Sequence, residues 1–377
     1  MTYKQIATVL NNSIMKNYLG EDTTIAEDLS NIVEVGKLIS TMTSDDLKTF
    51  QKELVVGARN EVLSRLYKVS DYGIIKDTIQ YGGALQRITA VGNYSTQDSH
   101  ILNLVNGESY LDGKYYGTGI DSRIYTSIKA FKVVHSISED NFSQMFMDAY
   151  SVAQFMGLIA ETEINTINAN MQALQDRLIM MGITTSYDSG RKIQLLTEFN
   201  KKTGATHTLA SIYADRELTA YFSDFCKEVI FRILDYVKRQ NKKYNDGTVL
   251  TFCPTDKAKV ILNTEFAGDI KFIGDAIDYN VPEIASYMTS PSWQNSTDKI
   301  LPSIADTAKI VTTEGGSKEY ANIVGFIYDS DSMGITNKLD KVTSEYVGTE
   351  GFTNLHHHCV ANYYIDNRFT GVVLTLD

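Results

Sequence analysis

The feature that most constrains the fold is a long proline-free segment with an uninterrupted apolar stripe. The first 253 residues contain no proline, and all four prolines lie in one later window, at Pro254, Pro282, Pro291 and Pro302. Between Glu139 and Met181, apolar side chains recur at alternating steps of four and three, which predicts one face of a helix. These side chains are Ala160, Ile164, Ile167, Met171, Leu174, Leu178 and Met181. At about 1.5 Å per residue, some 40 residues would extend roughly 60 Å, which is typical of a broad, thin molecule.

The flanking residues predict where this helix begins and ends. Ser138 is a candidate N-cap, followed by the acidic residues Glu139 and Asp140 in the first turn. Gly182 is the candidate C-terminal cap, and Gly157 is a candidate break into a short helix and a long one.

Composition limits the class of protein. The chain has 377 residues, 43% hydrophobic and 21% charged, which predicts an ordered protein of two or three compact units. No segment has the apolar length of a membrane span and the N-terminal residues lack a signal-peptide pattern, so we expect a cytoplasmic origin. The net charge of -11 argues against sequence-specific nucleic-acid binding but leaves proximity to packed DNA open. The three cysteines form no CxxC pair and are predicted to be buried free thiols: Cys226, Cys253 and Cys359.

Helices and strands are predicted to alternate along the chain, which indicates an α+β fold. Residues 1–40 are predicted to form a polar arm with short helical pieces, and Ser44 is expected to cap a helix to about Leu66. Residues Ile74–Gln80 are predicted to form a strand. Two alternating runs, 84–91 and 122–134, flank a glycine-containing stretch and predict a long hairpin with a flexible tip.

The second half predicts a mixed unit of sheet and helices. A helix is expected from Arg216 to Lys243, then a strand at 248–252 and a helix at 255–266. Strands follow at 308–313 and 321–329. The run from Asn354 to Leu376 predicts two strands joined by a turn.

Residues with catalytic or ligand-binding chemistry occur, but no motif organises them. The run from Gly113 to Gly119 lacks the ending of a phosphate loop, so hairpin flexibility explains its glycines. In a strand, His356 and His358 share a face while His357 points away, so at most two could ligate a metal together. Core or interface histidines are the favoured interpretation.

Four carboxylates and one histidine–serine pair are candidates for acid–base or triad chemistry. The carboxylates are expected on solvated faces: Asp329, Asp331, Glu161 and Glu163. His135 and Ser136 are neighbours in a predicted strand and face opposite ways, so they form no triad. The sequence therefore predicts no catalytic, cofactor-binding or metal residue and no cofactor.

Two tyrosine pairs are candidates for contacts between subunits, because tyrosine combines a large apolar area with a polar tip. They are Tyr115 with Tyr116 and Tyr363 with Tyr364, and a core position is an equal alternative for the second pair.

Three stretches resemble a known family. The segment 237–267 resembles the long helix, strand and following helix of short-tailed phage capsid proteins, and 323–335 with 351–376 resemble their closing segment. The order of elements resembles the tailed-phage, Hong Kong 97-like capsid fold. That resemblance implies an N-terminal arm, an extended β-hairpin loop, a spine helix near 152–181, and peripheral and axial domains. The implied boundaries are 1–40 for the arm, 41–81 and 131–205 for the peripheral domain, 82–130 for the loop, 206–344 for the axial domain and 345–377 for the peripheral C-terminal strands.

The same resemblance implies a structural role without enzymatic activity. Copies of the chain would form hexamers and pentamers of an icosahedral shell around double-stranded DNA, with scaffolding, portal and other head proteins as further partners and no membrane. The shell would be assembled in the host cytoplasm and become part of the virion. Another virion component, such as a portal or tail protein, and an enzyme without a recognisable motif are the alternatives. The hairpin and the arm are expected to bury their apolar residues on neighbouring copies.

Overall fold

The computed structural model describes most of the chain. Its described residues are 2–13, 24–39, 41–66, 72–76, 85–90, 106, 119–269, 288–289, 310–311, 319–320 and 322–376.

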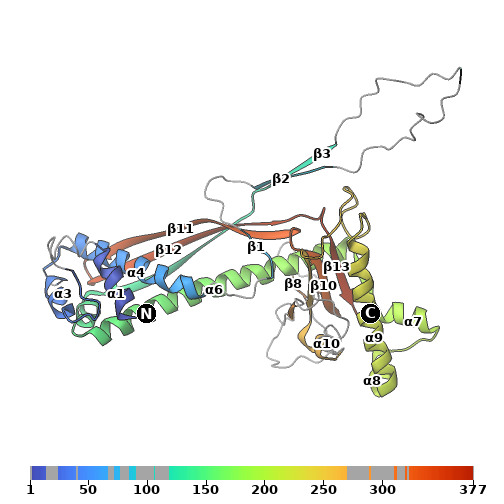
Figure 1. The fold of residues 1–377 in the computed structure, drawn as a ribbon, viewed down its shortest axis with the longest axis horizontal. Helices are drawn as coiled ribbons and strands as arrows, with labels where there is room; N and C mark the ends of the chain where they lie inside the picture. Colours follow the sequence, from blue (N-terminus) through green and yellow to red (C-terminus); the bar gives the residue numbers. More distant parts are fainter. Residues whose placement is uncertain are drawn as a thin grey trace.

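One helix runs along most of the molecule (Figure 1). This is α6 (Ala149–Asp188), which has 40 residues and follows the short α5 (Glu139–Met145). Ser138 accepts from the Asn141 backbone N–H at 3.3 Å, as expected of an N-cap. The predicted long helix is confirmed, but its expected break and end are both displaced.

The break in the helix falls at 146–148 instead of at Gly157. Asp148 caps α6 by accepting a 2.7 Å hydrogen bond from the Ser151 backbone N–H. Gly182 does not end the helix. A Cβ at Gly182 would lie 3.0 Å from Met333 Cε and 3.4 Å from Phe326, so this glycine lets strands pack closely against the helix.

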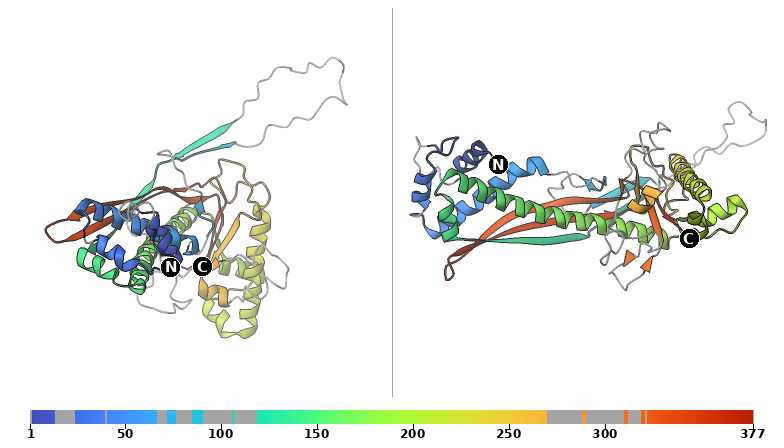
Figure 2. Two further views of the ribbon diagram at one scale, coloured as in Figure 1. Left: turned by 60° about the vertical axis from the view of Figure 1, so that its left-hand side comes forward. Right: turned by 90° about the horizontal axis from the view of Figure 1, so that it is seen from below.

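A four-stranded sheet lies along α6, in the order β1-β11-β12-β4 (Figure 2). Its two longest strands are β11 (Met333–Val347) and β12 (Phe352–Ile365), which pair antiparallel. The edge strands are β4 (Ile128–Ser138), antiparallel to β12, and the short β1 (Ile75–Lys76), parallel to β11. The sequence did not reveal β11, because polar residues dominate its alternation.

A second sheet of five strands has the order β5-β13-β10-β6-β7. The strands are β5 (Lys192–Gln194), β6 (Ala258–Leu262), β7 (Met288–Thr289), β10 (Ile323–Asp329) and β13 (Gly371–Thr375). A separate pair joins β8 (Ile310–Val311) to β9 (Glu319–Tyr320). The helices beside the five-stranded sheet are α7 (Leu195–Thr203), α8 (Leu209–Ala214), α9 (Arg216–Val237) and α10 (Thr264–Asp269).

Four expectations about this part were wrong. The strand expected at 248–252 is not formed, and only Thr251 makes an isolated bridge, to Asn241. The helix expected at 255–266 is mainly the strand β6, because its apolar run is buried in the sheet between β10 and β7. α9 ends at Val237 instead of Lys243, where the backbone N–H of Cys253 donates to the Val237 carbonyl at 2.8 Å. The two C-terminal strands exist, but β12 and β13 belong to different sheets.

The N-terminal segment is packed within its own chain. α1 (Tyr3–Asn11), α3 (Ile32–Ile39) and α4 (Ser44–Leu66) share a core with α5 and the first part of α6. Its buried members in the first 40 residues are Ile6, Ala7, Val9, Leu10, Ile25, Leu29, Ile32, Val35 and Ile39. The expected helical pieces are therefore present, but the expectation that this segment buries its apolar residues on a neighbour is wrong for the described residues. Thr43, not Ser44, caps α4, since its hydroxyl accepts from the Asp46 N–H at 3.3 Å.

The predicted hairpin is present and projects from the body (Figure 1). β2 (Leu85–Ala90) pairs antiparallel with β3 (Ile120–Tyr125). The chain then passes through 126–127 into β4, so the second alternating run is divided between the hairpin and the central sheet. The expected glycine-rich tip, with Tyr115 and Tyr116, lies outside the described residues.

The three cysteines are buried and free, as predicted. Among the described residues, no helix is both long enough and apolar enough to cross a lipid bilayer.

Candidate assembly site at the base of the hairpin

The hairpin joins the body through a cluster of three arginines and three aspartates, which we call the hub. It contains Arg87 from β2, Asp121 and Arg123 from β3, Asp246 from the loop after α9, and Asp366 and Arg368 from the turn between β12 and β13. Four segments far apart in sequence thus meet where the hairpin begins.

The central pair of the hub is fully buried. Arg368 and Asp366 are each 0% exposed, and Arg368 donates from Nε and Nη2 to the two Asp366 oxygens at 2.8 and 2.7 Å. This two-pronged geometry fixes both side chains and compensates the desolvation of two charges. Arg368 Nη1 also donates to the Asp121 carbonyl at 3.0 Å, which ties the turn to β3.

The two strands of the hairpin place arginines directly opposite each other. Arg87 and Arg123 are cross-strand partners, an arrangement that like charges normally destabilise. Arg123 donates to Asp246 Oδ2 at 2.7 Å and to Asp121 Oδ2 at 3.2 Å. Arg87 lies 3.9 Å from Asp366 Oδ2. The three carboxylates therefore neutralise the facing arginines and make the hairpin depend on the body.

Aromatic rings complete this anchorage. The Arg87 guanidinium lies 4.7 Å from the centre of the Phe369 ring and 5.1 Å from that of Tyr364. Tyr125 lies against Tyr364, with ring centres 5.5 Å apart. Burial, with the Asp366 charge, raises the pKa of Tyr125 to about 12. Tyr364 is thus buried beside the hub, which fits the core alternative for this residue.

Opposite the hub, the outer face of the hairpin is exposed and carries three isoleucines beside one polar pair, in which Gln86 donates to the Ser122 hydroxyl at 2.7 Å. Ile88 is 65% exposed, and Ile120 and Ile124 are each 64% exposed. Alternation places them on the side away from the charged residues. A strand pair with a neutralised inner face and an uncovered isoleucine face can bind another surface without rearranging its own base.

The carboxylates expected on solvated faces divide into two groups. Glu161 is exposed, whereas Glu163 is buried and its Oε1 lies 2.6 Å from His357 Nδ1. Asp329 is buried as well, and burial raises its pKa. Asp331 Oδ2 accepts from Lys257 Nζ at 2.5 Å. The expectation was wrong for Glu163, Asp329 and Asp331, because the fold places cations or a histidine beside them or removes them from water.

The histidine run follows the predicted alternation. His357 faces α6 and is buried, while His356 and His358 lie on the other side, with ring centres 6.3 Å apart. His358 Nε2 lies 3.1 Å from the Thr343 hydroxyl. His135 lies on the neighbouring strand, where Ser136 donates to Asn354 Oδ1 at 2.6 Å instead of to the histidine. Within the described part of the chain, no three His, Cys, Asp or Glu side chains come together as a metal site.

Sequence reasoning did not single out the hub. The usable signal was the alternation in 85–90 and 120–125, which places Arg87, Asp121 and Arg123 on one face and isoleucines on the other. The partners Asp366 and Arg368 could not be assigned, because they are more than 240 residues from the hairpin strands they hold.

A thin body spanned by one helix, with a projecting hairpin locked at its base and apolar on its outer face, defines a class of structural subunits that associate with copies of themselves. The family model described as "Phi29-like phage major capsid protein" matches residues 73–375, and the chain belongs to this family. Its role is therefore that of a structural protein that forms the phage capsid.

Solved capsids provide an independent comparison of the fold. The chain is similar to the capsid structure of Staphylococcus phage Andhra, with a TM-score of 0.54 and 11% identity, covering 82% of this chain and 84% of that chain. A capsid structure of the cyanophage P-SCSP1u matches with a TM-score of 0.47 and 10% identity, over 80% of this chain and 86% of that one. None of the curated proteins matches. The mixed α and β architecture expected from the resemblance to tailed-phage capsids is confirmed by the first of these likenesses.

Proposed function

We propose that the chain forms the wall of an icosahedral head as hexamers and pentamers, with the β2–β3 hairpin of each copy laid across a neighbour. The observation that carries this proposal is the exposed face of Ile88, Ile120 and Ile124 on a hairpin whose base is fixed. Burying one isoleucine side chain contributes about 1.5–3 kcal/mol, so three of them supply a substantial contact. Head-to-tail contacts of this kind give closed assemblies when the rotations that relate successive copies add up to a full turn.

The regions of the chain are assigned roles within this proposal. The expected boundaries, 206–344 for the axial domain, 82–130 for the extended loop and 41–81, 131–205 and 345–377 for the peripheral domain, are adjusted to the sheets. The five-stranded sheet, which includes β5 and β13, belongs to the axial domain around the symmetry axes, and the four-stranded sheet, which includes all of β4 and β11, belongs to the peripheral domain. Because the described helices of residues 1–40 share a core with α4, α5 and α6, we place them with the peripheral domain instead of on a neighbour. The connection between the hairpin and the four-stranded sheet is at 126–127, between β3 and β4.

The biological setting follows from the capsid role. The shell encloses double-stranded DNA, is assembled in the bacterial cytoplasm, and works with a scaffolding protein and a portal. The protein acts without enzymatic chemistry. Two observations support this part of the proposal. The sequence contains no catalytic motif, and the buried charged residues of the hub pair with one another to join segments of the fold.

Electron microscopy of the purified chain tests the assembly. The wild-type protein is expected to form closed shells, whereas a variant with Ile88→Ser, Ile120→Ser and Ile124→Ser is expected to remain unassembled in sedimentation velocity. A matched control replaces three exposed apolar residues elsewhere, Val33, Met147 and Leu158, with serine. Rings or tubes from the wild-type chain would favour a portal or tail protein. Shells from the hairpin variant in wild-type yield would contradict the role of the isoleucine face.

A further inference from the structure

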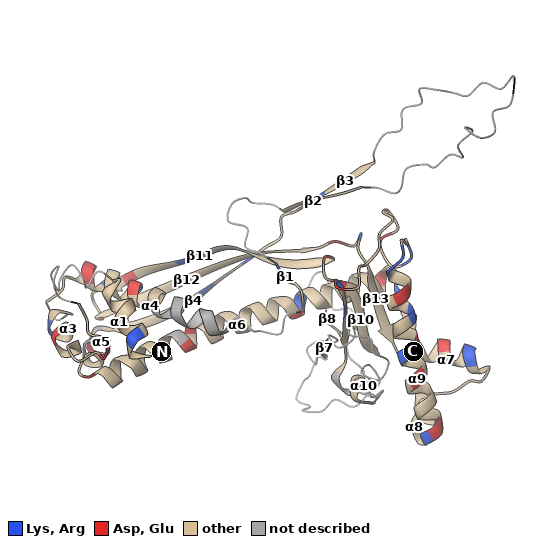
Figure 3. Ribbon diagram, in the orientation of Figure 1, with Lys and Arg blue, Asp and Glu red and all other residues tan. Residues whose placement is uncertain are grey.

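The middle of α6 is held to the rest of the chain by few side chains. The buried members of one apolar core end at Ile159 of this helix, and those of a second core begin at Leu174. Between these two positions, in a segment that we call the mid-span (160–173), the buried side chains among the described residues are Glu163 and Ile164. Long parts of α6 carry no charged side chain (Figure 3). The attachment of the mid-span therefore depends mainly on one carboxylate and one isoleucine.

Three side chains of the mid-span also bind the helix backbone. Thr162, Thr166 and Asn170 each donate to the carbonyl four residues earlier, at 2.8 Å. Such hydrogen bonds compete with those of the helix and often bend it. Few buried apolar contacts are typical of the segments of a protein that open locally. The mid-span is thus able to leave the sheet while the two cores stay packed.

Glu163 reaches from α6 to a histidine of the four-stranded sheet. Its Oε1 lies 2.6 Å from His357 Nδ1, and the two residues are 7% and 3% exposed. An ionised carboxylate can only accept, so Nδ1 carries the hydrogen. The other ring nitrogen, Nε2, lies 3.4 Å from Cys359 Sγ, and Glu163 Oε2 has no hydrogen-bond partner within the described structure. We call Glu163, His357 and Cys359 the clasp, because one imidazole joins α6 to β12.

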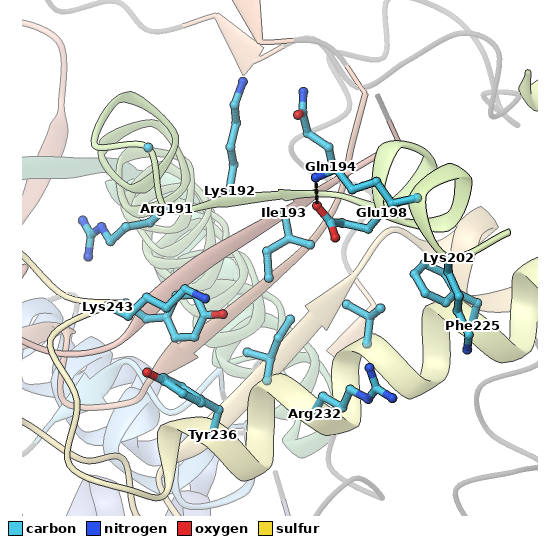
Figure 4. Close-up of a pocket in the computed structure, with 15 residues that line it drawn as sticks. Arg191, Lys192, Ile193, Gln194, Glu198, Lys202, Phe225, Arg232, Tyr236 and Lys243 are labelled. Atoms are coloured by element: carbon cyan, nitrogen blue, oxygen red, sulfur yellow. Dashed lines mark hydrogen bonds and ion pairs between the residues drawn. The ribbon is translucent and has the colours of Figure 1, made fainter. Parts of the chain in front are cut away.

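The clasp differs from the hub in the cation that it uses. Buried Asp366 is bound by Arg368, and exposed Glu198, beside the hollow drawn in Figure 4, pairs with Lys201 at 2.5 Å. Arginine and lysine stay charged at neutral pH, whereas histidine changes its charge between about pH 5 and pH 8. A buried carboxylate without a cation is costly, so Glu163 favours the protonated form of the imidazole. The attachment of the mid-span thus depends on a proton.

A second histidine lies near the same carboxylate but is kept neutral by burial. His135 of β4 is half-buried, and burial lowers its pKa, an effect that the Glu163 charge opposes. One carboxylate compensates one imidazolium, and His357 makes the 2.6 Å contact with it. On α6 itself, the neighbouring Glu161 is exposed. The proton at this interface therefore resides on His357.

The strands beside the clasp add one further carboxylate position. Val342 of β11 and Val133 of β4 are the register partners of His357 and carry no charge. Asp340 of β11 is the register partner of Cys359. The contribution of Asp340 to any pH dependence therefore has to be separated by experiment from that of the clasp.

We propose that the clasp is a proton-dependent attachment of the mid-span of α6 to the four-stranded sheet. With His357 protonated, the buried pair has no net charge and holds the helix. Without that proton, Glu163 is a buried charge without a cation, and the mid-span separates from the sheet. A histidine that holds its proton in the folded state adds stability below its unfolded pKa of about 6.5, and this stability is lost as the pH rises through the folded pKa. The attachment is present in the single chain and does not depend on the proposed assembly.

NMR of the unassembled full-length chain with isotope-labelled histidine tests the position of the proton. His357→Gln identifies the His357 signals by their loss. They are expected to be those of a mainly protonated ring at about pH 7, whereas in Glu163→Gln they become those of a neutral ring. Glutamine keeps an oxygen that accepts from Nδ1 and removes only the charge. A mainly neutral His357 in the wild-type chain at the same pH would overturn the proposal.

Hydrogen exchange corrected for intrinsic rates tests the attachment itself. Between about pH 6 and about pH 8, the wild-type mid-span is expected to lose about tenfold in protection relative to the rest of α6, because a factor of ten corresponds to one pKa unit. Glu163→Gln is expected to leave little of this pH dependence. Ile164→Ala removes the apolar half of the attachment and should lower protection by the same factor at both pH values. Thermal unfolding confirms that each variant is folded.

The control for the neighbouring carboxylate is Asp340→Asn, which should keep the pH dependence of the wild type. Loss of that dependence in Asp340→Asn but not in Glu163→Gln would assign the effect to β11 and overturn the proposal. Equal protection of the wild-type mid-span at both pH values would overturn it as well, since the pair would then be a structural contact alone. Loss of protection along the whole of α6 would contradict a local attachment.

Discussion

The N-terminal helices and the β2–β3 hairpin carry similar apolar side chains but place them in opposite environments. Ile6 and Leu10 of α1 are each 0% exposed in a core shared with α4 and α6, whereas Ile88 and Ile124 of the hairpin are nearly two-thirds exposed. The helices are held by apolar packing, and the hairpin is held at its base by ion pairs. A helix can bury one stripe against its neighbours in the same chain, while an isolated two-stranded hairpin has nothing behind its second face.

Under the proposed assembly, only the hairpin gains stability from neighbouring copies. A segment held by its own core should be equally stable in the free chain and in the shell. A segment held only at its base should gain stability when its outer face is covered. Our expectation treated both segments alike, and the structure separates them.

Breaking the hub should have the largest effect on the stability of the unassembled chain. Arg368→Ala leaves the buried Asp366 without the guanidinium that binds both of its oxygens, and breaking a buried pair costs about 3–5 kcal/mol. Chemical denaturation should show this loss, and hydrogen exchange should show faster exchange in β2 and β3 than in α1. Arg216→Ala, at an exposed position at the start of α9, is the control and should change stability by less than about 0.5 kcal/mol. Unchanged exchange in the hairpin would show that the hub does not hold it.

A cavity in the N-terminal core should have the next largest effect. Leu10→Ala removes a fully buried side chain and should destabilise the chain by about 2–5 kcal/mol. The loss should appear in thermal unfolding of the unassembled protein as well as of shells, because the packing is within one chain. Val33→Ala, about half exposed on α3, is a suitable control with little expected change. A loss seen only in shells would return this segment to the role of an arm on a neighbour.

Part of this arrangement could be predicted from the sequence. The apolar stripe and the N-cap predicted a long helical region that starts at Glu139, because both are local signals, but α6 continues past the expected end at Met181 to Asp188. Position 182 was misjudged, since a glycine that admits Phe326 and Met333 is indistinguishable from a C-terminal cap without the strands in place. The run 258–262 was misread as helical, because burial on both faces of a sheet removes the alternation that marks a strand.

The site was harder to predict than the fold. Arg87 and Arg123 are ordinary charged residues in sequence, and only pairing of β2 with β3 places them opposite each other. Their partner Asp366 is brought in by the turn after β12, a contact that no local pattern encodes. Glu163 was expected in solvent for the same reason, because His357 reaches it from a strand 194 residues away.

Lowering the pH should loosen the hairpin before it loosens the N-terminal helices. This effect on stability is expected to be smaller than the effects of Arg368→Ala and Leu10→Ala. Asp246 has a lowered pKa, because hydrogen bonds from Thr248 and Arg123 outweigh the opposing effect of burial. A carboxylate with a lowered pKa contributes stability above its unfolded value of about 3.9, and this contribution is lost as pH falls through the folded pKa. Hydrogen exchange corrected for intrinsic rates should therefore show the hairpin strands loosening below about pH 3.9 before α1 does. Asp246→Asn should remove most of this pH dependence, and a hairpin that loosens together with α1 would contradict the distinction.

The smallest effect is expected from the outer face of the hairpin in the free chain. Ile124→Ser replaces a side chain that is 64% exposed and should change the free energy of unfolding of the unassembled protein by less than about 0.5 kcal/mol. The same substitution at Ile137 of β4, which is 2% exposed, should cost more than about 2 kcal/mol, because it removes buried apolar volume and introduces a hydroxyl. Denaturant titration of both variants measures this contrast. A large loss from Ile124→Ser in the free chain would mean that the isoleucine face is already covered by the same molecule, and the hairpin would then resemble the N-terminal helices instead of differing from them.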